Sequence, residues 1–279
     1  MRPDSPSDPA LKTLELASGP VRYTDAGQGP VLIACHGCPG SVRDWRWMGP
    51  ILEQSVRLIR LDLPAFGETP LTTWADASNR GRARFVLAVA NALGIDRFAL
   101  MAHSAGGPMC LELAAEHPDR VTAVAFLGVP GLRPHRPLRE APFAHAIARV
   151  LWVPGLRQIL TVLLRRGFEK SGFPRGLPGD ALRQSMRVVH AFDFDRQGVN
   201  AARVQVPVLH AWTEDDRFIE REISEELAAA LPTVTPLPFP EGGHYLQKTR
   251  ATEISEAIVE LLTTASTDDR PGAGARTPA

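Results

Sequence analysis

Short, continuously apolar runs alternate along this chain with segments whose apolar residues recur at helical spacing. The runs at residues 31–35, 98–102 and 121–127 are typical of strands that are buried on both faces of a parallel sheet. Residues 79–93 place their apolar side chains on one helical face, and Gly94 ends that segment. The alternation predicts an α/β fold with a mainly parallel sheet and right-handed crossovers.

The middle of the chain departs from this pattern. Residues 131–203 contain no convincing strand but have helical stretches near 144–152 and 156–164, so we expect a helical cap inserted into the sheet domain. Further strands are expected at residues 11–16, 20–24, 56–61, 206–212 and 233–238, and further helices at 43–54, 109–117, 219–230 and 252–262. The predicted organisation is a flexible arm over 1–10, a core domain over 11–130 and 204–263, the cap over 131–203 and a disordered tail over 264–279.

Composition narrows the classes of function to consider. The chain has 279 residues, 44% of them hydrophobic, and a formal net charge of zero, which suits one sizeable α/β domain and gives no indication of a nucleic-acid partner. It has no apolar run of about eighteen residues, so we expect no membrane span. The N-terminal residues lack the apolar core of a secretion signal, and the three cysteines lack zinc-site spacing, so we expect a cytoplasmic protein without a bound metal.

The predicted cap is strongly basic, although the whole chain is neutral. It contains 13 basic and 5 acidic residues. The base composition of the gene, an anionic substrate and contact with anionic lipid would each produce such an excess. The sequence leaves these three explanations open.

A serine flanked by small residues stands where a buried strand passes into a helix. Ser104 has Ala102 two positions before it and Gly106 two positions after it, the spacing of a nucleophile elbow. Such a turn strains the backbone and lifts the hydroxyl clear of the sheet. Side chains larger than a methyl group at the two flanking positions would collide with the adjoining strand or helix. The turn also directs the amide of Ala105 at the place where an oxyanion would form. An ordinary strand followed by a serine N-cap would give the same stretch.

A serine hydroxyl needs a base, and the base needs a group that orients it. In an open α/β sheet these groups are expected just after strands, at the carboxyl edge of the sheet. Three stretches qualify, namely residues 213–216 with Glu214, Asp215 and Asp216, residues 242–244 with His244, and residues 36–39 with His36 and Cys38. The order of nucleophile, acid and histidine along the chain is the order typical of this kind of fold.

Taken together, these motifs resemble the α/β-hydrolase fold family, in the cap-bearing group that includes esterases, lactonases, epoxide hydrolases and haloalkane dehalogenases. The resemblance spans about residues 21–262. It rests on the segments His36-Gly37-Cys38-Pro39-Gly40, Asp62-Leu63-Pro64-Ala65-Phe66-Gly67, Ala102-His103-Ser104-Ala105-Gly106-Gly107, Glu214-Asp215-Asp216 and Gly242-Gly243-His244. It implies an eight-stranded sheet, no cofactor, Ser104 as nucleophile, Asp216 as acid and His244 as base. The backbone amides of Cys38 and Ala105 would form the oxyanion hole.

Two positions depart from the family pattern. Ala65 stands where a glycine is usual, and Thr213 replaces the usual glycine before the acid. The second departure weakens the register of that loop, so Asp215 remains a second candidate for the acid beside Asp216.

The type of nucleophile limits the chemistry. Relatives that open epoxides or displace halide use a carboxylate at the elbow, whereas Ser104 suits attack at a carbonyl. We therefore expect a serine hydrolase that cleaves a carboxylic ester or lactone through an acyl-enzyme, on a small, apolar or acyl-bearing substrate. Carbon–carbon bond hydrolysis of an acidic diketone, cofactor-free perhydrolysis and a ligand-binding protein without turnover remain alternatives. His36, His103 and Trp152 are candidates for lining the substrate site, and the oligomeric state is left open.

Overall fold

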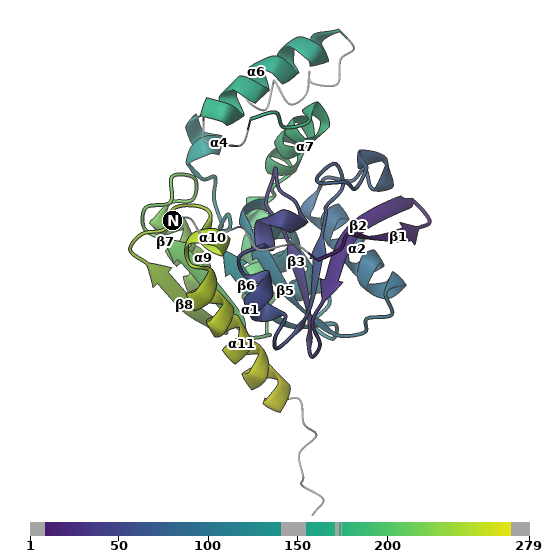
Figure 1. Cartoon of the computed structure of the whole chain (residues 1–279). Helices are drawn as coiled ribbons and strands as arrows, with labels where there is room; N and C mark the ends of the chain where they lie inside the picture. Colours follow the sequence, from purple (N-terminus) through teal and green to yellow (C-terminus); the bar gives the residue numbers. More distant parts are fainter. Residues whose placement is uncertain (1–8, 141–154, 171–172, 174, 269–279) are drawn as a thin grey trace, which may run out of the picture.

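A computed structural model of the chain describes residues 9–140, 155–170, 173 and 175–268 (Figure 1). The helical stretch expected near residues 144–152, which includes Trp152, lies outside this part of the chain. The same is true of the first eight residues and of residues 269–279.

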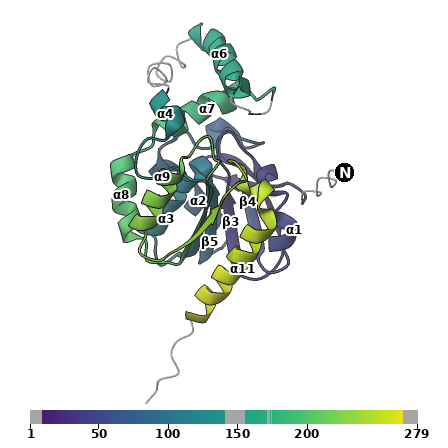
Figure 2. The same ribbon diagram turned by 90° about the vertical axis from the view of Figure 1, so that its left-hand side faces the viewer.

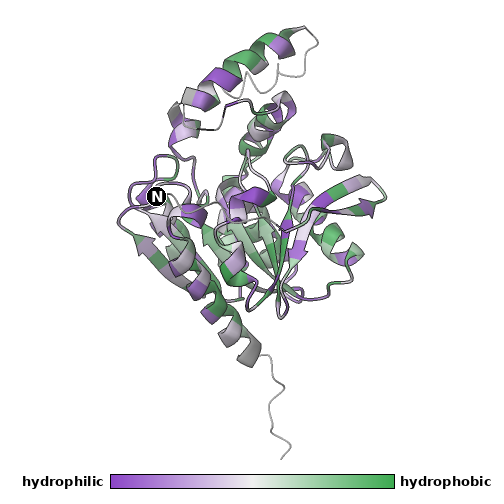
Figure 3. Ribbon diagram, viewed as in Figure 1, coloured by the Kyte–Doolittle hydropathy of each residue, from purple (hydrophilic) through white to green (hydrophobic). Residues whose placement is uncertain are grey.

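An eight-stranded, mainly parallel sheet forms the centre of the molecule, as the sequence predicts. The strand order is β1-β2-β4-β3-β5-β6-β7-β8. The pairs β1–β2 and β2–β4 are antiparallel, and the other pairs are parallel. The central strands are mostly apolar (Figure 3) because helices cover both faces of the sheet. The strands are β1 (Lys12–Leu16), β2 (Gly19–Ala26), β3 (Val31–Cys35), β4 (Arg57–Leu61), β5 (Phe98–His103), β6 (Val121–Leu127), β7 (Val208–Thr213) and β8 (Val234–Phe239).

Helices pack against the sheet in two layers, which Figure 2 shows edge-on. One layer contains α2 (Asn79–Ala92), α3 (Gly107–Glu116), α8 (Phe194–Arg203) and α9 (Arg221–Ala230). The opposite layer contains α1 (Gly49–Leu52) and α11 (Ala251–Asp268). None of the helices in the described part of the chain combines the length and apolar character that crossing a bilayer requires.

The helix expected over residues 43–54 is wrong. A 3-10 turn, η1 (Val42–Trp45), and the single turn of α1 replace it. Pro50 lacks the amide that a continuous helix would need at that position. Gly49, the first residue of α1, packs on the buried Arg60, and a Cβ there would come within 1.7 Å of its guanidinium.

The described cap elements lie above the carboxyl edge of the sheet. They are α4 (Arg136–Glu140), α6 (Leu156–Lys170) and α7 (Gly179–His190), and α6 is the element farthest from the sheet (Figure 1). Helix α8, which falls inside the predicted cap, packs on α3 in the core layer instead. The segment that the sequence assigns to the cap thus includes a helix that packs on the core. Residues 264–268, which the sequence assigns to the tail, continue α11.

A buried carboxylate joins α8 to the core. Glu112 on α3 is 1% exposed, and it accepts hydrogen bonds from the Arg196 guanidinium at 2.8 Å and from the Asn200 amide at 2.5 Å. Arg196 also pairs with Glu116 at 2.6 Å. These contacts fix the end of the inserted segment to the helix that begins at the serine elbow.

Removing this carboxylate should destabilise the fold. We expect Glu112→Ala to lower the free energy of unfolding by about 1–3 kcal/mol, because the Asn200 amide is left buried without an acceptor. The matched control is Glu225→Ala, which removes the exposed pair with Arg221 and should cost no more than about 0.5 kcal/mol. Urea unfolding followed by circular dichroism measures both, and equal losses would contradict the role given to Glu112.

Candidate active site

The serine elbow is strained in the way its sequence suggests. Ser104 has a φ of +49°, at the start of a 3-10 turn, η3 (Ser104–Gly106), between β5 and α3. A Cβ at Gly106 would lie 2.5 Å from the Cys35 carbonyl oxygen, and one at Gly107 would lie 2.4 Å from Val129. The limit on side-chain size at position 106 is therefore tighter than the sequence implies, because even a methyl group does not fit there.

The structure brings Ser104, His244 and Asp216 into one hydrogen-bonded series. His244 Nδ1 lies 2.8 Å from Asp216 Oδ2, and His244 Nε2 lies 2.9 Å from Ser104 Oγ. Because a carboxylate only accepts, Nδ1 carries the proton and donates to Asp216. Nε2 is then the acceptor for the Ser104 hydroxyl, which is the arrangement that general-base activation requires.

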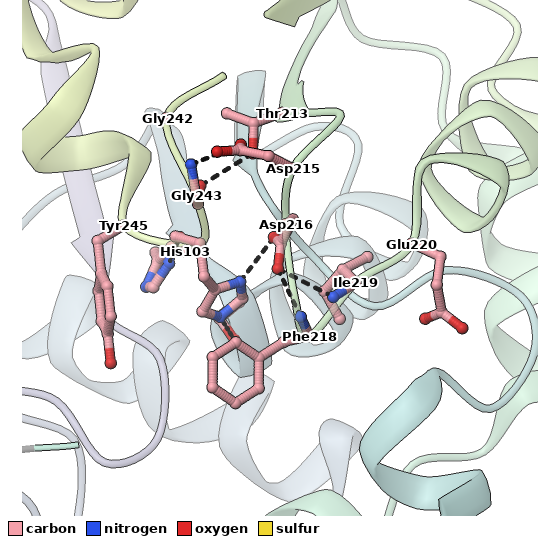
Figure 4. A network of polar contacts seen from close by, with 12 residues as sticks. His103, Thr213, Asp215, Asp216, Phe218, Ile219, Glu220, Gly242, Gly243 and Tyr245 are labelled. Carbon is pink, nitrogen blue, oxygen red and sulfur yellow. Dashed lines mark hydrogen bonds and ion pairs between the residues drawn. The ribbon is translucent and has the colours of Figure 1, made fainter. Parts of the chain in front are cut away.

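The two candidate acids have different surroundings (Figure 4). Asp216 is buried, and its second oxygen accepts the amides of Phe218 and Ile219 at 2.7 and 3.1 Å. Asp215 is exposed and accepts the Gly243 amide at 2.8 Å, which lowers the pKa of its carboxyl. Asp216 therefore reaches the imidazole, whereas Asp215 braces the loop that carries it.

His36 and His103 are candidates for lining the substrate site by sequence, but both are buried behind it. His36 Nε2 accepts the Leu63 amide at 3.0 Å, and Nδ1 bonds the Gly37 carbonyl, so this ring joins two loops. His103 Nε2 donates to the His244 carbonyl at 2.8 Å. Burial lowers the pKa of His36 to about 3 and that of His103 well below its usual value, so both rings are neutral.

Gly128 belongs to the site, although it was not identified from the sequence. It follows β6 with a φ of +54°, and a Cβ there would lie 3.4 Å from Asp216 Oδ2 and 3.7 Å from His244 Nδ1. A side chain at this position would strain the backbone, and its Cβ would lie 3.1 Å from Leu246 Cδ1 and in van der Waals contact with the carboxylate and imidazole. The feature of the sequence that could have identified Gly128 is its position directly after the buried strand β6.

The loop after β3 packs directly on the elbow. A Cβ on Gly37 would lie 3.0 Å from Ser104 Cβ, so only glycine lets the two segments approach this closely. Cys38 and Ala105, whose amides were expected to bind an oxyanion, both border the same cavity as Ser104.

A buried arginine supports the elbow from behind. Arg82, in the first turn of α2, is 4% exposed and donates from Nη1 to the Ala105 carbonyl at 2.8 Å. No carboxylate among the described residues pairs with it, and Nη2 is buried without a partner. Burial lowers the pKa of this guanidinium. Nothing in the sequence indicates that this helical arginine would face the elbow.

Ser104 and His244 open onto a cavity of about 410 Å³ beneath the cap. None of the described residues that line it is a lysine, arginine, aspartate or glutamate. The wall is formed largely by apolar side chains of α6, α7 and the segment after α7, namely Leu160, Leu164, Phe168, Met186, Val189 and Phe192. Such a wall favours uncharged, apolar ligands.

Comparison with known proteins agrees with this architecture. The family model described as alpha/beta hydrolase fold matches residues 30–145. A 2-hydroxy-6-oxo-6-phenylhexa-2,4-dienoate hydrolase of Burkholderia cepacia is 25% identical over 87% of this chain and 91% of its own length. Two solved structures share the fold at 18% identity. One is the haloalkane dehalogenase DbeA of Bradyrhizobium elkani, with a TM-score of 0.75 over 94% of this chain and 100% of its own length. The other is a thermophilic esterase of Thermogutta terrifontis, with a TM-score of 0.72 over 92% of this chain and 100% of its own length.

The thiol beside the elbow should be unreactive. Burial raises the pKa of Cys38 to about 11, so at pH 8 only about one thiol in a thousand is the reactive thiolate. We expect iodoacetamide to leave Cys38 unmodified at pH 8 for as long as the protein is folded, and its modification rate to rise about tenfold per pH unit towards pH 10. Peptide mapping by mass spectrometry measures this, with guanidinium-unfolded protein as the reactive control. Rapid labelling of Cys38 at pH 8 would contradict it.

Proposed function

Because this chain belongs to the α/β-hydrolase fold family, we propose that it is a serine hydrolase that cleaves a neutral carboxylic ester or lactone. The observation that carries the proposal is the hydrogen-bonded series Ser104–His244–Asp216 at the mouth of an apolar cavity. A nucleophile, a base and an orienting acid at these distances are what acyl transfer requires.

In the proposed first step, Ser104 Oγ attacks the substrate carbonyl while His244 Nε2 takes the hydroxyl proton. Asp216 stabilises the imidazolium that forms, and the amides of Cys38 and Ala105 receive the oxyanion of the tetrahedral intermediate. Each such donor typically contributes about 10²–10³ in rate. The intermediate collapses when the carbon–oxygen bond of the ester breaks and His244 gives its proton to the leaving alcohol.

The acyl-enzyme is then hydrolysed by the same groups. His244 Nε2 takes a proton from a water molecule, the resulting hydroxide attacks the acyl carbonyl, and Ser104 leaves with the proton held by His244. The acid is released and the hydroxyl of Ser104 is restored. The cap wall supplies an apolar binding surface for the acyl group throughout.

A second candidate, hydrolysis of a carbon–carbon bond in an acidic diketone, is favoured by several relatives. Those of Burkholderia cepacia and Comamonas testosteroni, for example, are named as hydrolases of a dienoate. A carboxylate bound inside the cavity would lose its hydration and need a cation in compensation. The described lining offers no arginine or lysine. We therefore favour a neutral ester over an anionic substrate.

Arg82 is proposed as a positioning residue for the oxyanion hole. It fixes the carbonyl of Ala105, and so the turn whose amide would bind the oxyanion. A buried guanidinium without a carboxylate partner lowers the stability of the fold. The presence of Arg82 here is explained if it holds the elbow in the position that catalysis requires.

The proposal is tested by labelling with a fluorophosphonate probe and by ester hydrolysis. We expect mass spectrometry to find the label on Ser104, and His244→Ala and Ser104→Ala to abolish it. Asp216→Ala should lower kcat by about 10³–10⁴-fold because the imidazolium loses its counter-charge. Asp215→Ala, the matched control, should lower kcat by no more than about tenfold, since it acts only through the loop.

Two outcomes would overturn this assignment. Absence of label from folded wild-type protein would favour a ligand-binding protein without turnover. A larger loss of kcat in Asp215→Ala than in Asp216→Ala would move the acid to the neighbouring residue and leave the nucleophile unchanged.

Replacing the buried arginine should separate stability from activity. We expect Arg82→Met to lower kcat for ester hydrolysis by about 10–100-fold with little change in KM, because the elbow loses its alignment. The free energy of unfolding should stay the same or rise, since an unpaired buried charge is removed. Arg82→Lys, which keeps the charge, should retain more activity than Arg82→Met. A parallel fall in stability and kcat would instead make Arg82 an ordinary structural residue.

A further inference from the structure

His135 is a polar side chain of the cavity wall to which the proposed reaction gives no role. It comes directly before α4 and lines the cavity together with Ser104 and His244. Its ring centroid lies 6.3 Å from that of Phe192, which belongs to the apolar wall. His135 thus faces the same space as the groups proposed to do the chemistry.

The segment that carries His135 is held firmly in place. The His135 carbonyl accepts the amides of Leu138 and Arg139 at 3.0 and 3.2 Å, which begins α4. Glu220 accepts the Arg136 amide at 2.9 Å and pairs with the Arg139 side chain. The imidazole is therefore presented from a fixed backbone, as a binding group should be.

The imidazole is buried, and one of its two nitrogens has no partner. His135 is 6% exposed, and its Nδ1 forms no hydrogen bond with the described residues. Burial, together with nearby His244, lowers the pKa of His135 to about 4, so the ring is neutral at physiological pH. A neutral imidazole has one donor and one acceptor nitrogen. Leaving a buried polar nitrogen without a partner is unfavourable, so a ligand that supplies a partner for this ring gains binding energy here.

We infer that His135 is a specificity residue, and that the substrate is an ester or lactone carrying a neutral hydroxyl or carbonyl group that hydrogen-bonds to it. The inference rests on the proposed function and narrows its substrate class. The apolar wall holds the hydrocarbon part of the substrate, and His135 recognises its one additional polar group. A carboxylate would not serve, because the ring is uncharged and no described lining residue is a cation.

Matched esters test this inference. The substrates are methyl hexanoate and its 2-hydroxy, 3-hydroxy, 3-oxo and 6-hydroxy derivatives, with the released acid titrated at constant pH. We expect the wild type to prefer at least one substituted ester over methyl hexanoate by about tenfold or more in kcat/KM. His135→Phe, which keeps a ring of similar size, should remove that preference while changing turnover of methyl hexanoate by less than about threefold.

Two further variants separate recognition from packing. His135→Gln keeps a neutral donor and acceptor and should restore part of the preference. Phe192→Leu alters the apolar wall beside His135 and should change kcat/KM for substituted and unsubstituted esters by similar factors. Fluorophosphonate labelling of Ser104 in each variant checks that the site is intact.

The outcomes distinguish this inference from the proposed function. If Ser104 labels and methyl hexanoate is hydrolysed, but no substituted ester is preferred, the inference about His135 fails and the serine hydrolase stands. If the preference persists in His135→Phe, the recognising group lies elsewhere and the inference also fails. If folded wild-type protein neither labels nor hydrolyses any ester, the proposed function itself fails.

Discussion

The left-handed backbone at Ser104 is the constraint on which the site depends. For a residue with a side chain, such a conformation costs about 1–3 kcal/mol and persists only where the surroundings enforce it. Gly106 lets the turn contact the end of β3, and Gly37 lets the neighbouring loop pack on the serine itself. Arg82 holds the next carbonyl from within the core. Contacts from two separate segments, the end of β3 with its following loop and helix α2, thus fix the direction of one hydroxyl.

Neutral histidines connect the loops around this turn. Burial keeps His36 and His103 uncharged, so each ring can donate through one nitrogen and accept through the other. His103 holds the backbone of His244, with the Gln247 amide 3.3 Å from its other nitrogen. A permanent cation at that position would oppose the imidazolium that the proposed reaction forms on His244. A neutral imidazole positions the base without that electrostatic cost.

The sequence predicts the sheet well and the surroundings of the site less well. The strands at 31–35 and 121–127 match to the residue because complete burial makes them continuously apolar. The prediction of a helix over 43–54 failed because Pro50 lacks the amide that a continuous helix needs, so the segment divides into η1 and α1. The choice between Asp215 and Asp216 depends on how one loop turns, and sequence spacing left both open. His135 stands between arginines and prolines, and only tertiary packing brings it to the cavity.

The inserted segment is anchored at both ends to elements that also carry the proposed site. At its start, Glu220 holds α4, and Glu220 lies in the same loop as Asp216, at the N-terminus of α9. At its end, α8 is tied through Glu112 to α3, the helix that begins just after Ser104. A shift of either anchor would therefore displace the cavity wall and a proposed catalytic group together. The position of His135 relative to Ser104 and His244 is thus set by the core, which is why we assign it to substrate recognition rather than to the cap surface.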